Sequence, residues 1–234
     1  MQVYVINALK ELSDEEFEKA LEIIDPEQKD RILRFHFFED RKRALAGILL
    51  SGYAIYKEFG IPKDEMKFEK NKYGKPHIVG KSGVHFNISH SGDYVACAVG
   101  GSSVGIDVQE HKSGGLDIAE RFFSQEEKDA LCKAVDSNSN SDDTKRKLFY
   151  DMWSLKEAYI KCIGMGLSKP LDEFGIVDRA GEYRLYENGV ESCEYHFMKY
   201  EFDENYSLCV CSKEADIPES YTQVMYKEMV GENI

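Results

Sequence analysis

The middle of the chain contains three strand-like segments so closely spaced that only tight turns can join them. These segments, 84–89, 94–99 and 104–109, are rich in β-branched and small apolar residues, and glycine-containing stretches separate them. Connections this short join antiparallel neighbours, because a parallel pair needs a long crossover. The sequence therefore predicts a β meander.

Helical signals lie on both sides of this meander. Two Ser-x-x-Glu capping boxes, at Ser13 and Ser124, are typical of helix N-termini, and Pro26 occupies a favoured first-turn position. Gly60 and Gly164 follow two longer periodic stretches and are expected to end them. We expect the first fifty residues to be helical, with helices also at about 40–59, 116–123, 124–135 and 147–163, a polar loop at 136–144, and strands near 183, 195–202 and 206–211.

Composition narrows the class of protein. The chain has 234 residues and a formal net charge of -13, which argues against general nucleic-acid binding because such binding needs a basic footprint. No run approaches the roughly 18 continuous apolar residues of a membrane helix, and no secretory signal is visible at the N-terminus. The six cysteines form no C-x-x-C pair. We therefore expect a cytoplasmic protein with reduced thiols that binds neither nucleic acid nor membrane.

The third strand alternates in polarity. Its apolar residues Val104, Ile106 and Val108 share one face, so Asp107 and Gln109 share the other. Two oxygen-bearing side chains side by side suit a hard cation such as Mg²⁺. A solvated strand face is the commoner reason for such a pattern, and from this segment alone both interpretations stay open.

The helix at 147–163 carries a second polar pair. Glu157 and Lys161 lie one turn apart, and Trp153, the only tryptophan, lies on the same side of the helix as Glu157. The pair is therefore either a surface ion pair or a metal ligand and proton acceptor beside a charge stabiliser. The apolar stripe on the roughly opposite side is predicted to consist of Leu148, Met152, Leu155, Tyr159 and Ile163.

Basic residues gather in one short region of this acidic chain. Arginine and lysine clusters bind phosphate, although a solvated helix face is the alternative. His90 lies in a predicted turn whose free amides can hold an anion, although a lone histidine is more often structural. No nucleophile motif, P-loop or dinucleotide-binding glycine pattern is present, so the substrate is expected to supply the nucleophile. The basic cluster comprises Lys29, Arg31, Arg34, Arg41, Lys42 and Arg43.

Six motifs occur in one order along the chain. They are YGKP at 73–76, NISHSG at 87–92, GIDV at 105–108, RFFS at 121–124, WSLKEAYIK at 153–161 and GMGLS at 164–168. With these motifs the chain resembles 4'-phosphopantetheinyl transferases of the surfactin-synthetase-activating type over nearly its whole length. The resemblance implies a monomeric α+β pseudo-dimer, with similar halves at residues 1–102 and 103–234 and coenzyme A in the cleft between them.

The resemblance also implies the roles of single residues. Asp107 and Glu157 would hold Mg²⁺, or Mn²⁺, with Gln109 at a third ligand position. Asp107, Glu157 and Lys161 would form the catalytic set. Coenzyme A would be bound by Arg31, Arg43, Ser89 and His90 around its 3'-phosphate, by Tyr73, Gly74, Lys75 and Pro76 on its adenine side, and by Lys156.

The implied reaction is a phosphoryl transfer in which positioning and charge neutralisation do most of the catalysis. A serine of an apo acyl or peptidyl carrier protein, docked near residues 116–135, would attack the β-phosphorus of coenzyme A and release 3',5'-adenosine diphosphate. Glu157, or a water on the metal, would take the serine proton. Mg²⁺ and Lys161 would stabilise charge on the pyrophosphate.

Two positions depart from the pattern of the family. Gln109 stands where many relatives carry a second acid, which puts metal affinity in doubt, and Gln28 stands where a lysine is frequent. Two other functions stay open at this stage. One is a non-catalytic module that binds coenzyme A or a carrier protein, against which the presence of both Glu157 and Lys161 argues. The other is a metal-dependent hydrolase of nucleotide pyrophosphates.

Overall fold

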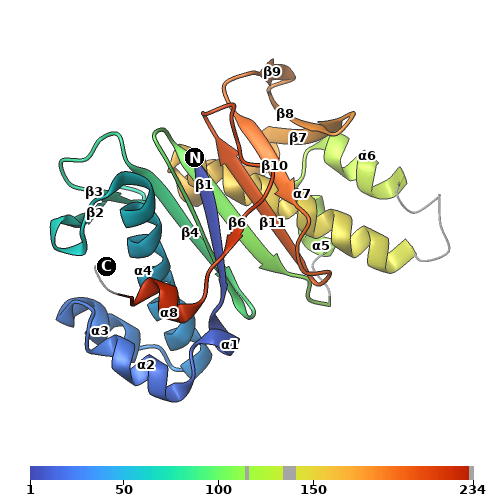
Figure 1. Ribbon diagram of the computed structural model, residues 1–234. Helices are drawn as coiled ribbons and strands as arrows, with labels where there is room; N and C mark the ends of the chain where they lie inside the picture. Colours follow the sequence, from blue (N-terminus) through green and yellow to red (C-terminus); the bar gives the residue numbers. More distant parts are fainter. Residues whose placement is uncertain (114–115, 134–140, 232–234) are drawn as a thin grey trace.

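Two antiparallel sheets built on the same plan form the centre of the molecule (Figure 1). A computed structural model describes residues 1–113, 116–133 and 141–231. The first half has the strand order β1-β5-β4, and the second half has the corresponding order β6-β11-β10. In both orders the strand that comes last in the sequence lies in the middle and pairs with the other two. These strands are β1 (Gln2–Asn7), β4 (His85–Ser91), β5 (Tyr94–Gly100), β6 (Val104–Glu110), β10 (His196–Tyr200) and β11 (Tyr206–Ser212).

One long helix packs on the outer face of each sheet. Helix α4 (Phe38–Phe59) covers the first sheet, and helix α7 (Ser141–Ile163) covers the second, so the layers run helix, sheet, sheet, helix (Figure 1). The structure therefore confirms the α+β class and the arrangement of two similar halves. The remaining elements are α1 (Ala8–Glu11), α2 (Asp14–Leu21), α3 (Pro26–Leu33), β2 (Phe68–Lys70), β3 (Pro76–Ile78), α5 (Leu116–Phe122), α6 (Gln125–Lys133), β7 (Phe174–Arg179), β8 (Glu182–Glu187), β9 (Val190–Ser192), β12 (Thr222–Gln223) and α8 (Tyr226–Met229).

The inner faces of the two sheets share one hydrophobic core. Val3 and Ala96 from the first sheet belong to the same buried cluster as Ile106 and Val210 from the second. The apolar face predicted for the strand at 104–109, which includes Val104 and Ile106, is fully buried in this cluster. The halves thus bury each other's apolar surface.

The C-terminal segment returns to the first half. Strand β12 pairs in parallel with β1, and helix α8 buries Tyr226 and Met229 in the core around α4. The division of the chain at residues 102 and 103 stays a prediction about its domains, and residues 222–230 pack with the first half.

Local signals in the sequence predicted most helix boundaries. Both capping boxes form, because Ser13 and Ser124 each accept the amide hydrogen bond of the glutamate three residues later and that glutamate accepts in return. Gly60 ends α4 in the left-handed conformation, with φ 64°. None of the helices in the described ranges has the length and apolar character needed to cross a bilayer.

Four predictions about secondary structure were wrong. The segments 84–89, 94–99 and 104–109 do not form one β meander, because β6 belongs to the second sheet and pairs with β11 instead of β5. The first fifty residues are not all helical, because β1 is a strand at the centre of the first sheet; both of its faces are buried, so it lacks the polar alternation of a half-exposed strand. Helix α7 begins at Ser141, so residues 141–144 of the predicted loop are helical, and residues 136–140 lie outside the described residues. The predicted apolar stripe is too narrow, because Phe149, Tyr150 and Ile160 are also buried.

Candidate active site

Helix α7 lies directly on strand β6 because Gly105 has no side chain. A Cβ at this position would lie 2.0 Å from the carbonyl oxygen of Ala158 and 2.3 Å from the amide nitrogen of Cys162, so any other residue would push the two elements apart. The next residue on the same face of β6 is Asp107. The close approach therefore brings Asp107 to the turn of α7 that carries Lys161.

Asp107 is a buried carboxylate with one occupied and one unpartnered oxygen. Its Oδ1 accepts hydrogen bonds from Lys161 Nζ at 2.6 Å and from Ser89 Oγ at 2.9 Å. Lys161 also donates to Ser89 Oγ at 2.9 Å and to the Ile106 carbonyl at 3.2 Å. Asp107 Oδ2 is buried and has no partner among the described residues. A buried oxygen in this state costs free energy unless a bound group completes it, so Oδ2 marks a ligand position.

Glu157 lies one helical turn before Lys161 and is largely shielded from solvent. Its pKa is raised, chiefly by the loss of solvent and then by the negative charge of Asp107, while the Lys161 ammonium acts in the opposite direction. The predicted ion pair between Glu157 and Lys161 is not among the ion pairs of the described residues, because Lys161 binds Asp107 instead. A divalent cation between the two carboxylates would relieve their repulsion.

The side chains present fit a magnesium ion that shares its coordination with a substrate. Within the described ranges, no group of three or more His, Cys, Asp and Glu side chains is arranged to hold a metal. Asp107 and Glu157 offer two carboxylates, and Gln109 lies two residues from Asp107 on the same face of β6. This set suits Mg²⁺, which keeps several waters and is usually held by one or two carboxylates and by substrate phosphates.

Polar side chains at every second position of β4 join this strand to β6. Asn87 Oδ1 accepts the amide hydrogen of Ile106 at 2.9 Å. Ser91 Oγ accepts the amide hydrogen of Glu110 at 3.0 Å, and Ser89 reaches Asp107 between them. The sequence interpretation missed Asn87 and Ser91, although three polar residues at a spacing of two were the signal for a bonded strand face. The Ser89 hydroxyl is engaged here, so its contact with a 3'-phosphate stays a prediction.

The other face of this hairpin carries His90 and lies beside Arg43, whose guanidinium is paired with Asp40. His90 lies in strand β4 and not in a turn, which corrects the expectation for this residue. Arg43 Nη1 donates to the Gly92 carbonyl at 2.7 Å. Loss of solvent around the imidazole, and then the charges of Arg43 and Lys161, lower the pKa of His90. Arg31 lies on the last turn of α3 and is exposed, with no ion pair among the described residues.

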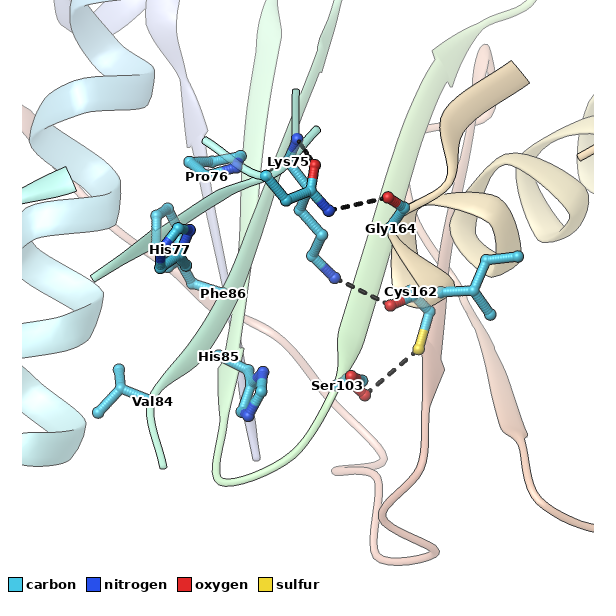
Figure 2. A pocket seen from close by; sticks show the side chains of 11 residues that line it. Lys75, Pro76, His77, Val84, His85, Phe86, Ser103, Cys162 and Gly164 are labelled. Atoms are coloured by element: carbon cyan, nitrogen blue, oxygen red, sulfur yellow. Dashed lines mark hydrogen bonds between the residues drawn. The ribbon is translucent and has the colours of Figure 1, made fainter. Parts of the chain in front are cut away.

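Lys75 joins the first half to the C-terminal end of α7. Its Nζ donates to the Val104 carbonyl at 2.8 Å and to the Cys162 carbonyl at 3.0 Å, as Figure 2 shows for the second of these. Burial lowers the pKa of this lysine. A cation at the negative end of a helix dipole is favourable, so Lys75 has a structural role in addition to the contact with coenzyme A that its motif predicts.

A small cavity lies beside the Lys75 side chain, between the two halves (Figure 2). Its volume is about 210 Å³. The turn before it is held by Asn71, whose Oδ1 accepts the amide hydrogens of Tyr73 and Lys75, both at 2.9 Å, and Gly74 adopts φ 92°. The polar and proline residues around the cavity include Asn71, Lys75, Pro76, His77, His85 and Ser103.

Lys156 does not reach the cleft, contrary to its assignment to coenzyme A. The residue is 0% exposed, and its Nζ donates to Glu127 Oε2 and to the Phe174 carbonyl, both at 2.6 Å. Its ammonium also lies 4.4 Å from the centroid of the Phe174 ring. A buried lysine requires such a partner, and this one fixes α6 and β7 to α7.

Comparisons with known proteins give one consistent result over the whole chain. A family model described as "4'-phosphopantetheinyl transferase, N-terminal" matches residues 11–101, and one described as "4'-phosphopantetheinyl transferase superfamily" matches residues 103–211. The chain is 37% identical over 238 residues to 4'-phosphopantetheinyl transferase Sfp of Bacillus subtilis (strain 168), covering 98% of this chain and all of the relative. It is also 31% identical over 214 residues to the L-aminoadipate-semialdehyde dehydrogenase-phosphopantetheinyl transferase of Mus musculus, covering 84% of this chain and 69% of the relative.

Proposed function

The chain belongs to the 4'-phosphopantetheinyl transferase superfamily, and from this premise we propose that Asp107, Glu157 and Lys161 carry its chemistry. The protein is an enzyme that transfers the phosphopantetheine arm of coenzyme A to a carrier protein. The acceptor in our proposal is a serine of an apo acyl or peptidyl carrier. The observation that supports this site is the unpartnered, buried Asp107 Oδ2 beside Glu157 and Lys161.

The proposed reaction joins the serine oxygen to the β-phosphorus of coenzyme A and breaks the bond to the bridging pyrophosphate oxygen. The products are the phosphopantetheinyl carrier and 3',5'-adenosine diphosphate. Mg²⁺, or Mn²⁺, held by Asp107, Glu157 and Gln109 would supply charge neutralisation for the pyrophosphate when bound. Glu157, or a water on the metal, would accept the serine proton.

Lys161 and Asp107 act as a preorganised pair in this proposal. The ammonium of Lys161 is fixed by three oxygen acceptors, so it needs little rearrangement to stabilise charge that develops on the pyrophosphate. Asp107 is fixed in turn by Lys161 and Ser89, which leaves only its Oδ2 for a ligand.

Coenzyme A is proposed to lie along the seam between the halves. The Arg43 guanidinium beside His90 supports a 3'-phosphate position at that end of the seam, and Arg31 on α3 is proposed to reach the same group. The cavity beside Lys75 and Pro76 supports an adenine position near the 73–76 turn.

The carrier is proposed to dock near residues 116–135, of which 134 and 135 lie outside the described residues. Ile118 on α5 is 38% exposed and offers an apolar contact at this surface. A monomer in the cytoplasm is also proposed, and all six cysteines of the chain being free thiols supports the reducing compartment.

One experiment tests the transferase and separates it from its two rivals. The protein is incubated with coenzyme A, Mg²⁺ and several apo carriers, and both the carrier mass and the coenzyme A are measured. We expect one phosphopantetheine arm on the carrier serine, only when divalent metal is present. Coenzyme A cleaved without a gain in carrier mass would indicate a pyrophosphate hydrolase, and no chemistry with retained binding would indicate a binding module.

A further inference from the structure

We propose that Ser91 is a positioning residue that turns the side-chain amide of Gln109 so that its oxygen, and not its NH₂ group, faces the metal position beside Asp107. This inference rests on the proposed function, because it needs the metal site that Asp107 and Glu157 form. It concerns this chain in particular, since many relatives are expected to carry an acid where Gln109 stands.

Two neighbours determine which end of the amide points toward β4. Gln109 Nε2 lies 3.4 Å from Ser91 Oγ and 3.4 Å from the carbonyl oxygen of Glu110. A carbonyl oxygen can only accept a hydrogen bond, so the end of the amide near it must be the NH₂ group. Each contact is long, so the orientation depends on both together.

The Ser91 hydroxyl is itself held in place. Its Oγ accepts the amide hydrogen of Glu110 at 3.0 Å, which fixes it against β6 at the end of the seam where β4 and β6 run side by side (Figure 1). Ser89, two residues earlier on β4, donates to Asp107 Oδ1, whereas Ser91 accepts from Gln109 Nε2. Two serines on one face of β4 therefore each occupy one end of a side chain on β6, and the other end is left for a ligand.

The chemistry of an amide makes such a partner necessary. A carboxylate presents an oxygen whichever way it is turned, whereas an amide presents either an oxygen or an NH₂ group. Mg²⁺ and Mn²⁺ bind oxygen, and an NH₂ group turned toward the cation adds only repulsion and lost space. Gln109 therefore contributes to the metal site only while something holds its nitrogen away, and Ser91 does this.

A double-mutant cycle tests the inference without measuring catalysis. Mn²⁺ affinity is measured by electron paramagnetic resonance of the free ion, with coenzyme A present and no carrier protein, for the native chain, Ser91→Ala, Gln109→Glu and the double variant. We expect Ser91→Ala to weaken Mn²⁺ binding about fivefold in the native background, the size of one lost hydrogen bond. With Gln109→Glu, binding should tighten, and adding Ser91→Ala should then change it less than twofold.

Comparing Ser91→Ala in the native and Gln109→Glu backgrounds isolates the effect of Ser91 on the Gln109 amide. The lost bond between Ser91 and the Glu110 amide is common to both backgrounds and cancels. Ser91→Thr keeps the hydroxyl and should restore native affinity. Equal weakening in both backgrounds, or none in the native one, overturns the role of Ser91. Asp107→Asn serves as the reference for the site, and if it leaves Mn²⁺ affinity unchanged, the proposed metal site itself is wrong and the inference fails with it.

Discussion

At the scale of single residues, the site depends on how two carboxylates differ in their partners. Asp107 has Oδ1 filled by Lys161 and Ser89, whereas Glu157 has a raised pKa, chiefly because it is shielded from solvent and then because of the negative charge of Asp107. Asp107 is therefore held in one orientation, and Glu157 is suited to exchange a proton. A pair of acids whose environments differ in this way is typical of acid–base sites.

Replacing Glu157 with glutamine should separate catalysis from stability. Loss of the base and of one metal ligand should lower the transfer rate on the order of 10²-fold or more. Thermal stability without metal should be unchanged or higher, because a neutral amide replaces a poorly solvated carboxylate that faces Asp107. Steady-state kinetics and thermal unfolding measure both. Glu18→Gln, at an exposed position of α2, is the control, and near-native turnover of Glu157→Gln would contradict the assignment.

His90 should make coenzyme A binding depend on pH. Its pKa is lowered in the free protein, and a bound 3'-phosphate would raise it, so binding would be accompanied by proton uptake. Affinity should then fall as pH rises through the pKa of bound His90, and level off below the lowered pKa of the free protein. Calorimetry over a pH series measures this. Dephospho-coenzyme A should lack the dependence, and His90→Gln should leave only the titration of the phosphate; an unchanged profile in His90→Gln would refute the contact.

At the scale of elements, the contact between β6 and α7 positions the site. Gly105 allows backbone to approach backbone, and Asp107 and Lys161 meet because of it. The turn held by Asn71 and Lys75 then fixes the end of α7 to the first half. Helix α7 is therefore held both by the sheet of its own half and by the first half of the chain.

Adding one methyl group at Gly105, where β6 contacts α7, should strongly destabilise the protein. Gly105→Ala places a Cβ within 2.3 Å of two backbone atoms, which cannot move aside as a side chain can. We therefore expect the free energy of unfolding to fall by about 2 kcal/mol or more, and metal affinity to be lost. Gly52→Ala in helix α4 is the matched control, because nothing lies within 4 Å of its Cβ. It should stabilise the protein by about 0.5–1 kcal/mol. Denaturant unfolding measures both, and equal effects of the two changes would contradict the close packing.

At the scale of the whole molecule, two similar halves share one hydrophobic core. The inner core contains residues of both sheets, such as Val5 and Leu208. The Met1 ammonium pairs with Glu214 at 3.1 Å, and Tyr206 Oη accepts the amide hydrogen of Asp93 at 3.0 Å. Strand β12 also pairs with β1 across more than two hundred residues of chain.

The two halves should therefore not unfold in two separate transitions, although they have the same strand arrangement. We expect one cooperative unfolding transition by calorimetry and by circular dichroism, with coincident midpoints, because neither sheet keeps its inner face buried without the other. A fragment of residues 1–102 should not fold alone, since it would expose that face and lack β12 and α8. Two resolved transitions, or a folded fragment, would show that the division at residues 102 and 103 separates independent domains.

The sequence by itself determined the features that depend on neighbours within a few residues. The capping boxes, the glycine end of α4 and the alternation of β6 all follow from local hydrogen bonding and side-chain direction, and the structure confirms them. The order of the motifs identified the family, and with it Asp107, Glu157 and Lys161 as the residues to examine.

Only the tertiary structure decided which of these polar groups meet. Lys161 pairs with Asp107 and not with Glu157 one turn away, and Lys156 is buried against Glu127 instead of facing coenzyme A. Strand β1 lies inside a sheet because β5 and β12, both distant in sequence, pair with its two edges. Periodicity records which face of an element is apolar, but it does not record which distant segment packs there. That choice depends on the close approach of backbones and on the need of each buried charge for a partner.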